Sequence, residues 1–216
     1  MKDKQRKMLV LAVSILIGIT CLVGGILNYS RNKVDRSKIA QLAFKKTAAD
    51  KATGFEITED FLTVNPYSRP GTALTKVNNI VVHYVANPGS TAKENRDYFE
   101  GLATSRLTSA SSHYVVGLKG EIIQCIPLNE VAYCSNDRNN DTISIEVCHP
   151  GEDGKFNEDT YNSLVSLCAW LCDAYELDSE SLIRHYDITG KICPKYFVEH
   201  PDKWKKFKKD VKKEMK

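Results

Sequence analysis

The sequence predicts an α/β fold in which a mixed central β-sheet is flanked by helices and preceded by one transmembrane helix. Three observations lead to this prediction. Short runs rich in Val and Ile alternate with longer stretches whose apolar residues recur at helical spacing, which is typical of a sheet covered by helices. Two of these runs are joined by a Lys-Gly turn, which indicates an antiparallel pair. An unbroken apolar run near the N-terminus predicts the membrane helix.

The apolar run occupies residues 8–27, "MLVLAVSILIGITCLVGGIL". It contains no charged residue and is about long enough to cross a hydrocarbon core of ~30 Å. A cleaved signal peptide is the alternative, but no A-x-A-like cleavage site follows the run. The short basic segment 1–7 favours a cytoplasmic N-terminus. We therefore expect a single-pass protein of the cell membrane with its folded domain on the extracytoplasmic side, or a secreted protein if the run is cleaved.

A polar segment rich in Lys, Ala and Asp follows at 28–54 and is typical of a stalk or linker. The folded domain is expected over 55–216, with the turn-rich stretch "NPYSRPG" near its entry. The chain carries 30 basic and 27 acidic residues. A nucleic-acid-binding protein would more often be basic across a whole face, so we exclude nucleic acid as a partner. We expect a monomer.

The first half of the domain predicts a strand, a helix and a hairpin. "NNIVVHYVAN" at 78–87 is an apolar, β-branched run that suits a central strand. A helix is expected to begin at Thr91, because Glu94 three residues later completes a capping box. "SSHYVVGL" and "EIIQCIPL" are expected to pair through the turn at Lys119 and Gly120.

The second half predicts one more strand and two helices. "DTISIEVCHP" at 141–150 is a further buried strand. Asn157 is the expected N-cap of a long helix, since the apolar residues that follow it recur at helical spacing. The basic segment 201–216 carries Trp204, Phe207 and other apolar residues on one side, so we expect a last helix that packs on the domain.

Cysteines do not define a disulfide scaffold here. Cys168 and Cys172 lie four residues apart within the predicted long helix, where they are expected to pack as small apolar groups. Cys125 and Cys134 could pair outside a cell, and spacing alone leaves that question open.

Three residues have the chemistry of a catalytic zinc site. His185 and Cys193 lie within one short stretch, "RHYDITGKICP", and offer an imidazole and a thiolate. His83 lies inside an apolar strand, where a polar side chain needs a partner. Three protein ligands with an open fourth position are typical of catalytic zinc, and a thiolate favours zinc over magnesium or calcium. The alternative for His83 is a core histidine bonded to a carbonyl group.

Two further residues are candidates for proton transfer and charge stabilisation. Glu146 sits among Ile and Val in "ISIEVCHP", an expensive place for a carboxylate unless the protein uses it as a general base. The alternative is a strand residue that faces solvent. Lys191, two residues before Cys193, could stabilise an oxyanion. An ordinary exposed lysine is the alternative.

Four segments together resemble a known family. They are "NPYSRPGTALTKVNNIVVHYVANPG", "SSHYVVGLKGEIIQCIPLNEVAY", "ISIEVCHP" and "RHYDITGKICP". In order and spacing they resemble the zinc-dependent N-acetylmuramoyl-L-alanine amidases of the amidase-2 type. That family includes bacterial and prophage cell-wall lysins and is similar in fold to peptidoglycan recognition proteins. The resemblance covers roughly residues 55–200.

The resemblance implies a site and a reaction. It implies zinc ligands at His83, His185 and Cys193, a general base at Glu146 and an oxyanion-stabilising lysine at Lys191. It implies hydrolysis of the amide bond between N-acetylmuramic acid and L-alanine in peptidoglycan. The lysines of segment 201–216 are expected to attract anionic wall polymers or lipid head groups as well.

Two positions depart from the pattern of some relatives. Ser112 stands where related phage enzymes have a catalytic tyrosine, and Cys134 stands where some relatives carry a histidine. The alternative function is a membrane-anchored module that binds peptidoglycan without cleaving it. A structural zinc domain is a third class, and it would need a fourth ligand such as His113 or His149.

Overall fold

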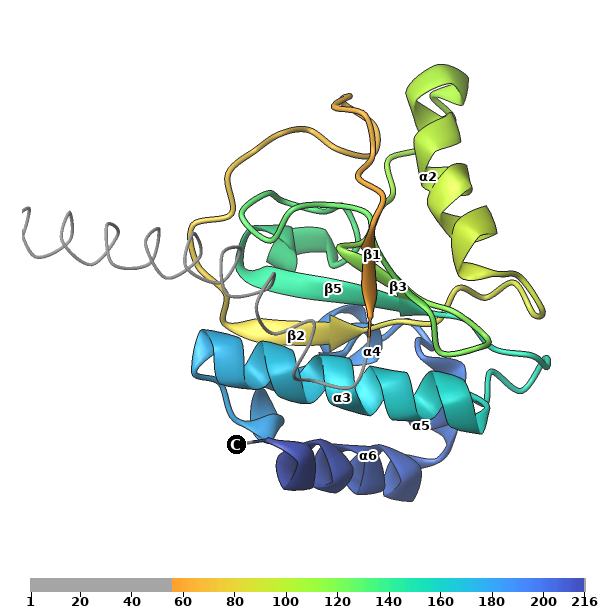
Figure 1. The fold of residues 1–216 in the computed structure, drawn as a ribbon, viewed down its shortest axis with the longest axis vertical. Coiled ribbons are helices and arrows are strands. Elements are labelled where there is room, and N and C mark those ends of the chain that lie inside the picture. The colour runs from red at the N-terminus through yellow and green to blue at the C-terminus, as the bar shows by residue number, and fades with distance from the viewer. Residues whose placement is uncertain (1–55, 216) are drawn as a thin grey trace, which may run out of the picture. The chain divides into compact units, whose positions relative to one another are not determined.

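A computed structural model of the chain describes residues 56–215 (Figure 1). The predicted cytoplasmic segment 1–7, membrane helix 8–27 and stalk 28–54 lie outside the described residues.

The described residues form a six-stranded sheet in the order β1-β4-β3-β5-β2-β6. All neighbouring strands run parallel except β3 and β4, which form the antiparallel hairpin expected from the Lys-Gly turn. The prediction of a mixed sheet is therefore confirmed. The strands are β1 (Ile57–Glu59), β2 (Asn79–Val82), β3 (Tyr114–Val116), β4 (Ile122–Gln124), β5 (Thr142–Val147) and β6 (Leu182–Arg184).

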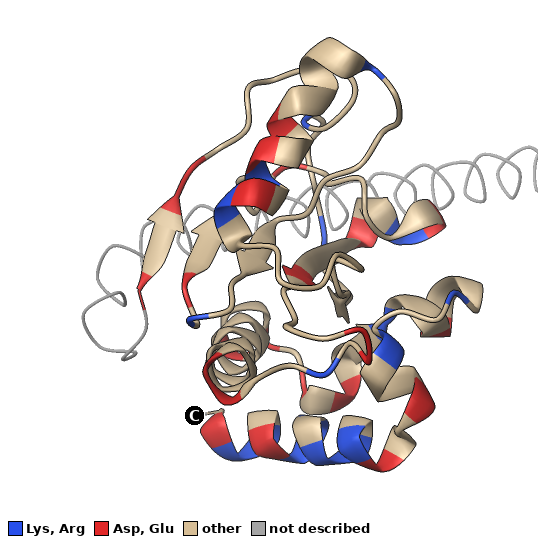
Figure 2. Cartoon of the chain, turned by 90° about the vertical axis from the view of Figure 1, so that its right-hand side faces the viewer, with Lys and Arg blue, Asp and Glu red and all other residues tan. Residues whose placement is uncertain are grey.

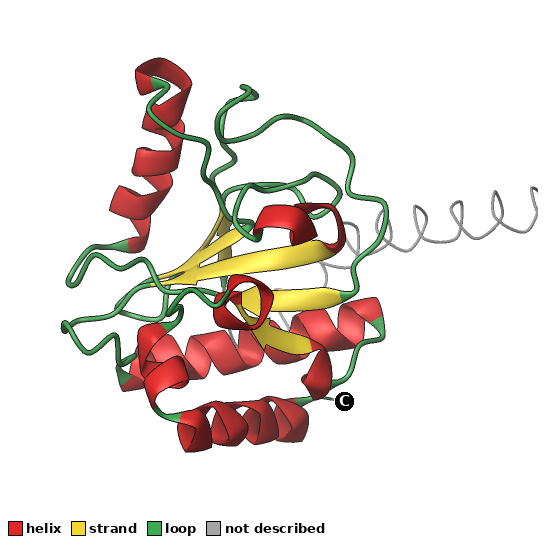
Figure 3. Ribbon diagram, turned by 180° about the vertical axis from the view of Figure 1, so that it is seen from behind, coloured by secondary structure: helices red, strands yellow, loops and turns green. Residues whose placement is uncertain are grey.

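Helices cover both faces of this sheet, as Figures 1 and 3 show from opposite sides. α2 (Ala92–Ser105) packs on one face, and α3 (Glu158–Tyr175) with α6 (Pro201–Glu214) on the other. Each face of the sheet has its own apolar cluster, and successive side chains of β3 point to opposite faces. Val115 packs in the cluster that includes Phe99 of α2, whereas Tyr114 and Val116 pack in the cluster that includes α3. The short helices are η1 (Asn136–Asp141), η2 (Ser179–Ser181), α4 (His185–Thr189) and α5 (Lys195–Glu199).

Both long helices near the sheet begin where their capping residues predict. The Thr91 hydroxyl accepts a hydrogen bond from the Glu94 backbone N–H, and the Glu94 carboxylate accepts one from the Thr91 N–H, which completes the capping box of α2. The Asn157 side chain accepts a hydrogen bond from the Thr160 N–H at the start of α3 (2.9 Å). These contacts satisfy backbone donors that the first helical turn leaves unpaired.

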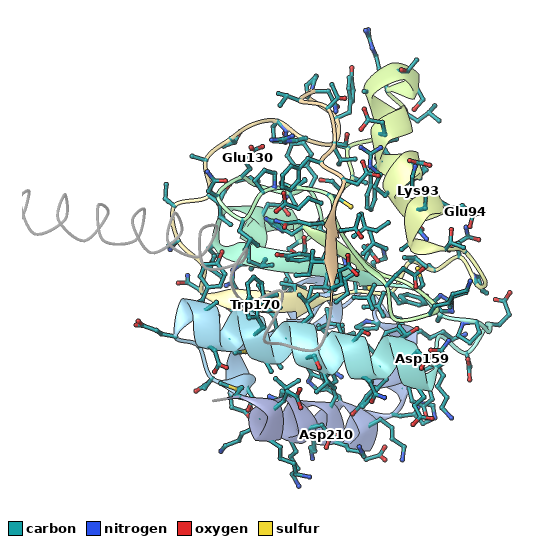
Figure 4. The ribbon with its side chains drawn as sticks, viewed as in Figure 1. Lys93, Glu94, Glu130, Asp159, Trp170 and Asp210 are labelled. Atoms are coloured by element: carbon teal, nitrogen blue, oxygen red, sulfur yellow. The ribbon has the colours of Figure 1, made fainter. Side chains whose placement is uncertain are left out.

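The C-terminal helix completes the core beneath α3. Trp204, Phe207 and Val211 of α6 are buried, and each burial contributes about 1.5–3 kcal/mol. Tyr161 of α3 donates a hydrogen bond to Asp210 of α6 (2.8 Å), which links the two helices. Asp210 is labelled on the ribbon of α6 in Figure 4. The prediction that this basic segment packs its apolar stripe on the domain is confirmed.

The structure corrects one expectation about strands and answers the question that spacing left open about the cysteines. The sequence prediction missed β1 and β6, because neither lies in a sustained apolar or alternating run. Cys125 and Cys134 are both free thiols, so the structure contains no bond between them. Cys168 and Cys172 are buried in α3, as expected for small apolar groups.

Among residues 56–215, no helix combines the length and the apolar character that crossing a membrane requires. Of the helices in that range, α3 is the longest, with 18 residues and acidic side chains near both ends, and α6 is rich in lysine.

Candidate metal centre

The sheet register brings His83 and His185 together. Val82 of β2 pairs with Arg184 of β6, and the two histidines are the next residues along these neighbouring parallel strands. The His83 backbone N–H donates to the Ile145 carbonyl (2.9 Å), which continues the pairing with β5. The two imidazole rings have their centroids 4.7 Å apart. The site therefore lies at the carboxyl ends of parallel strands, where open α/β sheets commonly bind ligands.

A tight turn brings Cys193 back to the same place. Gly190 has a φ of 78° and ends α4, with its N–H donating to the Tyr186 carbonyl (2.8 Å). The Tyr186 N–H in turn donates to the Cys193 carbonyl (3.0 Å), which closes the loop. Cys193 Sγ then lies 3.8 Å from His83 Nδ1. A residue with a β-carbon would be strained at Gly190, so this turn favours glycine.

Asp187 fixes the start of this loop. Its carboxylate accepts hydrogen bonds from the Arg184 backbone N–H (2.8 Å) and from the Arg184 guanidinium (2.7 Å). The same guanidinium donates to the Phe197 carbonyl (3.0 Å), which ties the loop to α5. Asp187 therefore caps the loop and is not among the clustered side chains.

His83, His185 and Cys193 fit a metal ion by their arrangement and chemistry. One potential ligand atom from each lies within 4.8 Å of the other two, and all three residues are buried. His83 Nε2 is buried and has no hydrogen-bond partner among residues 56–215. A buried polar atom without a partner is costly, so a ligand at this position would remove a penalty.

The pKa values at the site favour metal-binding forms of the histidines. Burial lowers the pKa of His83 well below its usual value, and the positive charges of His185 and Lys191 lower it further. Burial also lowers the pKa of His185. Both imidazoles are therefore neutral near pH 7. Burial raises the pKa of the Cys193 thiol to about 12, so a cation would have to displace its proton.

Glu146 points into the same site from β5 and does not face solvent. Its Oε1 accepts a hydrogen bond from Cys134 Sγ (3.7 Å), and its Oε2 is buried with no partner among the described residues. Burial raises the pKa of Glu146 to about 8. His83, Cys134 and Glu146 form a second group whose ligand atoms lie within 4.8 Å of one another.

Lys191 is the exposed cation beside this buried cluster. Its positive charge lowers the pKa of His83, His185, Glu146 and Cys193. Lys191 is exposed and lies two residues before Cys193 in the chain, which puts it at the solvent side of the site.

The other two histidines considered as extra ligands are engaged elsewhere. His113 Nδ1 lies 3.1 Å from Ser144 Oγ, and His113 Nε2 lies 3.0 Å from the Glu130 carbonyl oxygen. His149 Nδ1 lies 2.7 Å from the Gly151 carbonyl oxygen, in the turn after β5. Neither belongs to the groups with metal-ligand spacing among the described residues.

Sequence reasoning missed Asn136, whose Oδ1 lies 2.8 Å from His185 Nε2. It also left Cys134 without a role. The two residues belong to the segment before β5, which is far from His185 in the chain. No sequence pattern could have found these contacts, because they arise only when that segment packs against α4.

Comparisons with known proteins identify the family to which this chain belongs. The family model described as N-acetylmuramoyl-L-alanine amidase (Amidase_2) matches residues 73–196. The N-acetylmuramoyl-L-alanine amidase CwlL of Bacillus licheniformis is 38% identical over 169 residues, which cover 72% of this chain and 46% of that protein. The amidase BlyA of Bacillus subtilis (strain 168) is 37% identical over 179 residues, or 73% of this chain and 47% of that protein. The chain thus spans about half the length of these relatives.

Solved structures show the same fold. The catalytic domain of XlyA has a TM-score of 0.61 and 29% identity, and the match covers 72% of this chain and 99% of that one. PlyL has a TM-score of 0.62 and 25% identity, with coverage of 73% and 98%.

The relatives also bear on the predicted location in the cell membrane. They are described as amidases, a catalytic domain and an endolysin, and none as a membrane protein. These relatives contradict the predicted location in the cell membrane. The predicted membrane helix 8–27 itself lies outside the described residues. The predicted enzyme family is confirmed: the chain belongs to the amidase-2 type of N-acetylmuramoyl-L-alanine amidases.

Proposed function

We propose that this chain hydrolyses the amide bond between N-acetylmuramic acid and L-alanine in peptidoglycan, with residues 55–216 as the catalytic unit. The observation that carries the proposal is the convergence of His83, His185 and Cys193 within 4.8 Å of one another, beside the buried carboxylate of Glu146. One chain supplies all four side chains, so we propose that it acts as a monomer.

Zinc is the proposed metal, held by His83, His185 and Cys193. Two imidazoles and one thiolate are a donor set that suits zinc, and three protein ligands leave a position for a reactant. When bound, zinc supplies Lewis acidity for the scissile carbonyl group and lowers the pKa of a water molecule from about 15.7 to about 7.

Glu146 is the proposed general base and acid. Cys134 holds its Oε1, which leaves the buried Oε2 as the oxygen available for a proton. Oε2 would accept a proton from water as the water oxygen bonds to the carbonyl carbon. The same proton would pass to the L-alanine nitrogen as the carbon–nitrogen bond breaks. A divalent cation close by favours the carboxylate form, against the effect of burial that raises its pKa to about 8.

Lys191 is the proposed stabiliser of the negative oxygen in the tetrahedral intermediate. Its charge reaches the buried cluster, as its effects on the pKa of His83 and Glu146 indicate, yet its side chain is exposed. A cation at the solvent side of the site can meet the substrate carbonyl as charge develops on it.

Digestion of purified peptidoglycan by the full chain tests the proposal. Bound zinc is measured first, and products are then compared for wild type, Glu146→Gln and the control Glu158→Gln, an exposed carboxylate at the start of α3. We expect new L-alanine amino termini without new reducing sugar ends. The rate should fall about 10²- to 10⁴-fold in Glu146→Gln, with zinc retained, and stay unchanged in the control.

Two results would overturn the proposal. If the wild-type protein binds no zinc, the proposed metal centre is rejected. Stoichiometric zinc with tight muropeptide binding but no cleavage would identify a peptidoglycan-binding module instead.

We also propose that α6 contacts anionic polymers of the wall. Figure 2 shows lysine concentrated in this helix. Lys205, Lys209 and Lys212 are exposed, and none has an ion-pair partner among residues 56–215. Their spacing of four and three residues puts them on one stripe, opposite the buried residues of the helix. Such a cationic stripe complements a polymer with repeated negative charges.

Sedimentation with cell walls tests this contact. Lys205→Gln, Lys209→Gln and Lys212→Gln are combined in one variant. We expect it to bind walls more weakly at low salt than wild type, and to bind equally well once the anionic polymers are extracted. Cleavage of soluble muropeptides should not change. Equal binding of variant and wild type to intact walls would reject the contact.

A further inference from the structure

We infer that Asn136 is a positioning residue for the metal centre: its side-chain oxygen fixes the tautomer and the ring orientation of His185. This inference rests on the proposed zinc site. It concerns a residue of η1 that neither the site motifs nor the proposed reaction steps use.

The contact defines which nitrogen of His185 carries the proton. Asn136 Oδ1 lies 2.8 Å from His185 Nε2. An amide oxygen only accepts hydrogen bonds, so a neutral imidazole must donate from Nε2. The lone pair then lies on Nδ1, which is the nitrogen left to bind a metal. Without this acceptor, nothing on Nε2 would favour one tautomer over the other.

His185 depends on such a contact more than His83 does. His83 is 1% exposed and its backbone is held in the sheet by the bond to Ile145. His185 is 7% exposed and opens α4, a helix of only five residues. Packing therefore constrains the His185 ring less, and a hydrogen bond to its outer nitrogen supplies the missing constraint.

The backbone of Asn136 is held in an uncommon conformation that aims its side chain. Its φ is 51°, in the left-handed region that asparagine tolerates better than most residues. The Ser135 and Cys134 N–H groups both donate to Asn139 Oδ1, at 2.6 and 3.1 Å, which holds the chain on the N-terminal side of Asn136. Strained backbone of this kind persists where surrounding contacts determine it.

η1 is in turn anchored to the sheet. Arg138 binds the Asp141 carboxylate through two hydrogen bonds of 2.8 Å. It also donates to Asn79 Oδ1 at the start of β2 (2.6 Å). The Thr142 hydroxyl at the start of β5 donates to the Arg138 carbonyl (2.7 Å). The acceptor for His185 is thus presented by a segment fixed to the strands that lead to His83 and Glu146.

Two substitutions separate the side chain from the backbone. Asn136→Gly removes the amide and accepts the positive φ, so it does not add strain. Asn136→Asp keeps an acceptor oxygen on a side chain of the same length, and aspartate also tolerates the left-handed φ. Arg106→Gly is the matched control, because Arg106 also has a left-handed φ (56°) but ends α2, away from the site.

Zinc affinity of the full chain, measured by competition with a chelator, is the first readout. Outer partners of metal-binding histidines typically contribute 10- to 100-fold in affinity, so we expect about that loss in Asn136→Gly. Asn136→Asp should recover most of it, and Arg106→Gly should match wild type. Long-range ¹⁵N–¹H spectra of the zinc-free protein are the second readout. They should show His185 protonated on Nε2 in wild type and Asn136→Asp, and a mixture of tautomers in Asn136→Gly.

The outcomes separate this inference from the proposed function. If wild type binds zinc tightly and Asn136→Gly binds it equally well with an unchanged tautomer, the role of Asn136 is rejected and the zinc site stands. If wild type binds no zinc, the metal centre itself fails, and the inference fails with it.

Discussion

Two buried histidines, His83 and His113, occupy comparable positions and differ in the hydrogen-bond partners of their rings. Each is 1% exposed and lies beside a strand of the same sheet. Both ring nitrogens of His113 have partners, Ser144 Oγ and the Glu130 carbonyl. His83 Nε2 has none among the described residues, and Cys193 Sγ is 3.8 Å from its Nδ1. The residues that the structure describes satisfy both ring nitrogens of His113, whereas none of them pairs with the buried His83 Nε2.

The surroundings of the two rings differ as well. The pKa of His113 is lowered to about 4 by burial, and its hydrogen bond to Glu130 partly opposes that effect. The pKa of His83 is lowered by burial and further by the charges of His185 and Lys191. His113 is thus part of the core, whereas His83 belongs to a cluster in which neighbouring positive charges disfavour its protonation. Burial alone does not distinguish a structural histidine from a metal ligand.

The largest effect should come from His83→Gln. We expect zinc binding to be lost and activity to fall about 10³-fold or more, since Lewis-acid stabilisation contributes several kcal/mol. The zinc-free variant should unfold at nearly the same urea concentration as zinc-free wild type. Metal analysis, cleavage rates and urea titration check the three parts. A variant that keeps zinc and full activity would show that His83 is a core histidine like His113.

Lys191→Ala should have the next largest effect. We expect kcat to fall about 10²- to 10³-fold, the usual loss for one oxyanion-stabilising donor, with zinc content unchanged. The exposed Lys119 in the β3–β4 turn provides a control, and Lys119→Ala should cleave at the wild-type rate. Steady-state kinetics on a soluble muropeptide measure both. Equal rates in the two variants would show that Lys191 is an ordinary exposed lysine without a catalytic role.

His113→Gln should show the opposite pattern to His83→Gln. Gln cannot reproduce both hydrogen bonds of the ring, so we expect the free energy of unfolding to fall by about 2 kcal/mol. Zinc content and the cleavage rate of the folded enzyme should stay near wild type. The exposed His200 gives the matched control, and His200→Gln should change stability by less than about 0.5 kcal/mol. Loss of zinc in His113→Gln would contradict the separation of the two histidines.

The pH dependence of stability should carry the signature of His113. Its pKa is about 4 when folded, below the ordinary value of 6.5, so the unfolded chain binds the extra proton first. The contribution is fully present above pH 6.5 and is lost as the pH falls towards 4. Between pH 7 and 5 it should cost about 2 kcal/mol.

Urea titrations of zinc-free wild type and His113→Gln at the two pH values isolate this contribution. The variant should lose about 2 kcal/mol less stability than wild type over this interval, because it lacks the titrating group. The same loss in both proteins would mean that other groups account for the pH dependence.

Elements with a strong local pattern could be predicted, and elements without one could not. The capping residues Thr91 and Asn157 located the starts of α2 and α3, because a side chain that binds its own helix acts within one turn. β6 is only three residues long and was missed, although its end places His185. Its strand character comes from pairing with β2, which no local pattern encodes.

The sequence by itself determined the kinds of chemical group at the site, the starts of α2 and α3, and the family. Those properties depend on residue type and short spacing. Only the tertiary structure decided which groups meet: the register of β2 with β6, the return of Cys193 through the turn at Gly190, and the contact of Asn136 with His185. Each of these three contacts joins residues that neither helical nor strand spacing places side by side. Tertiary packing alone therefore determines them.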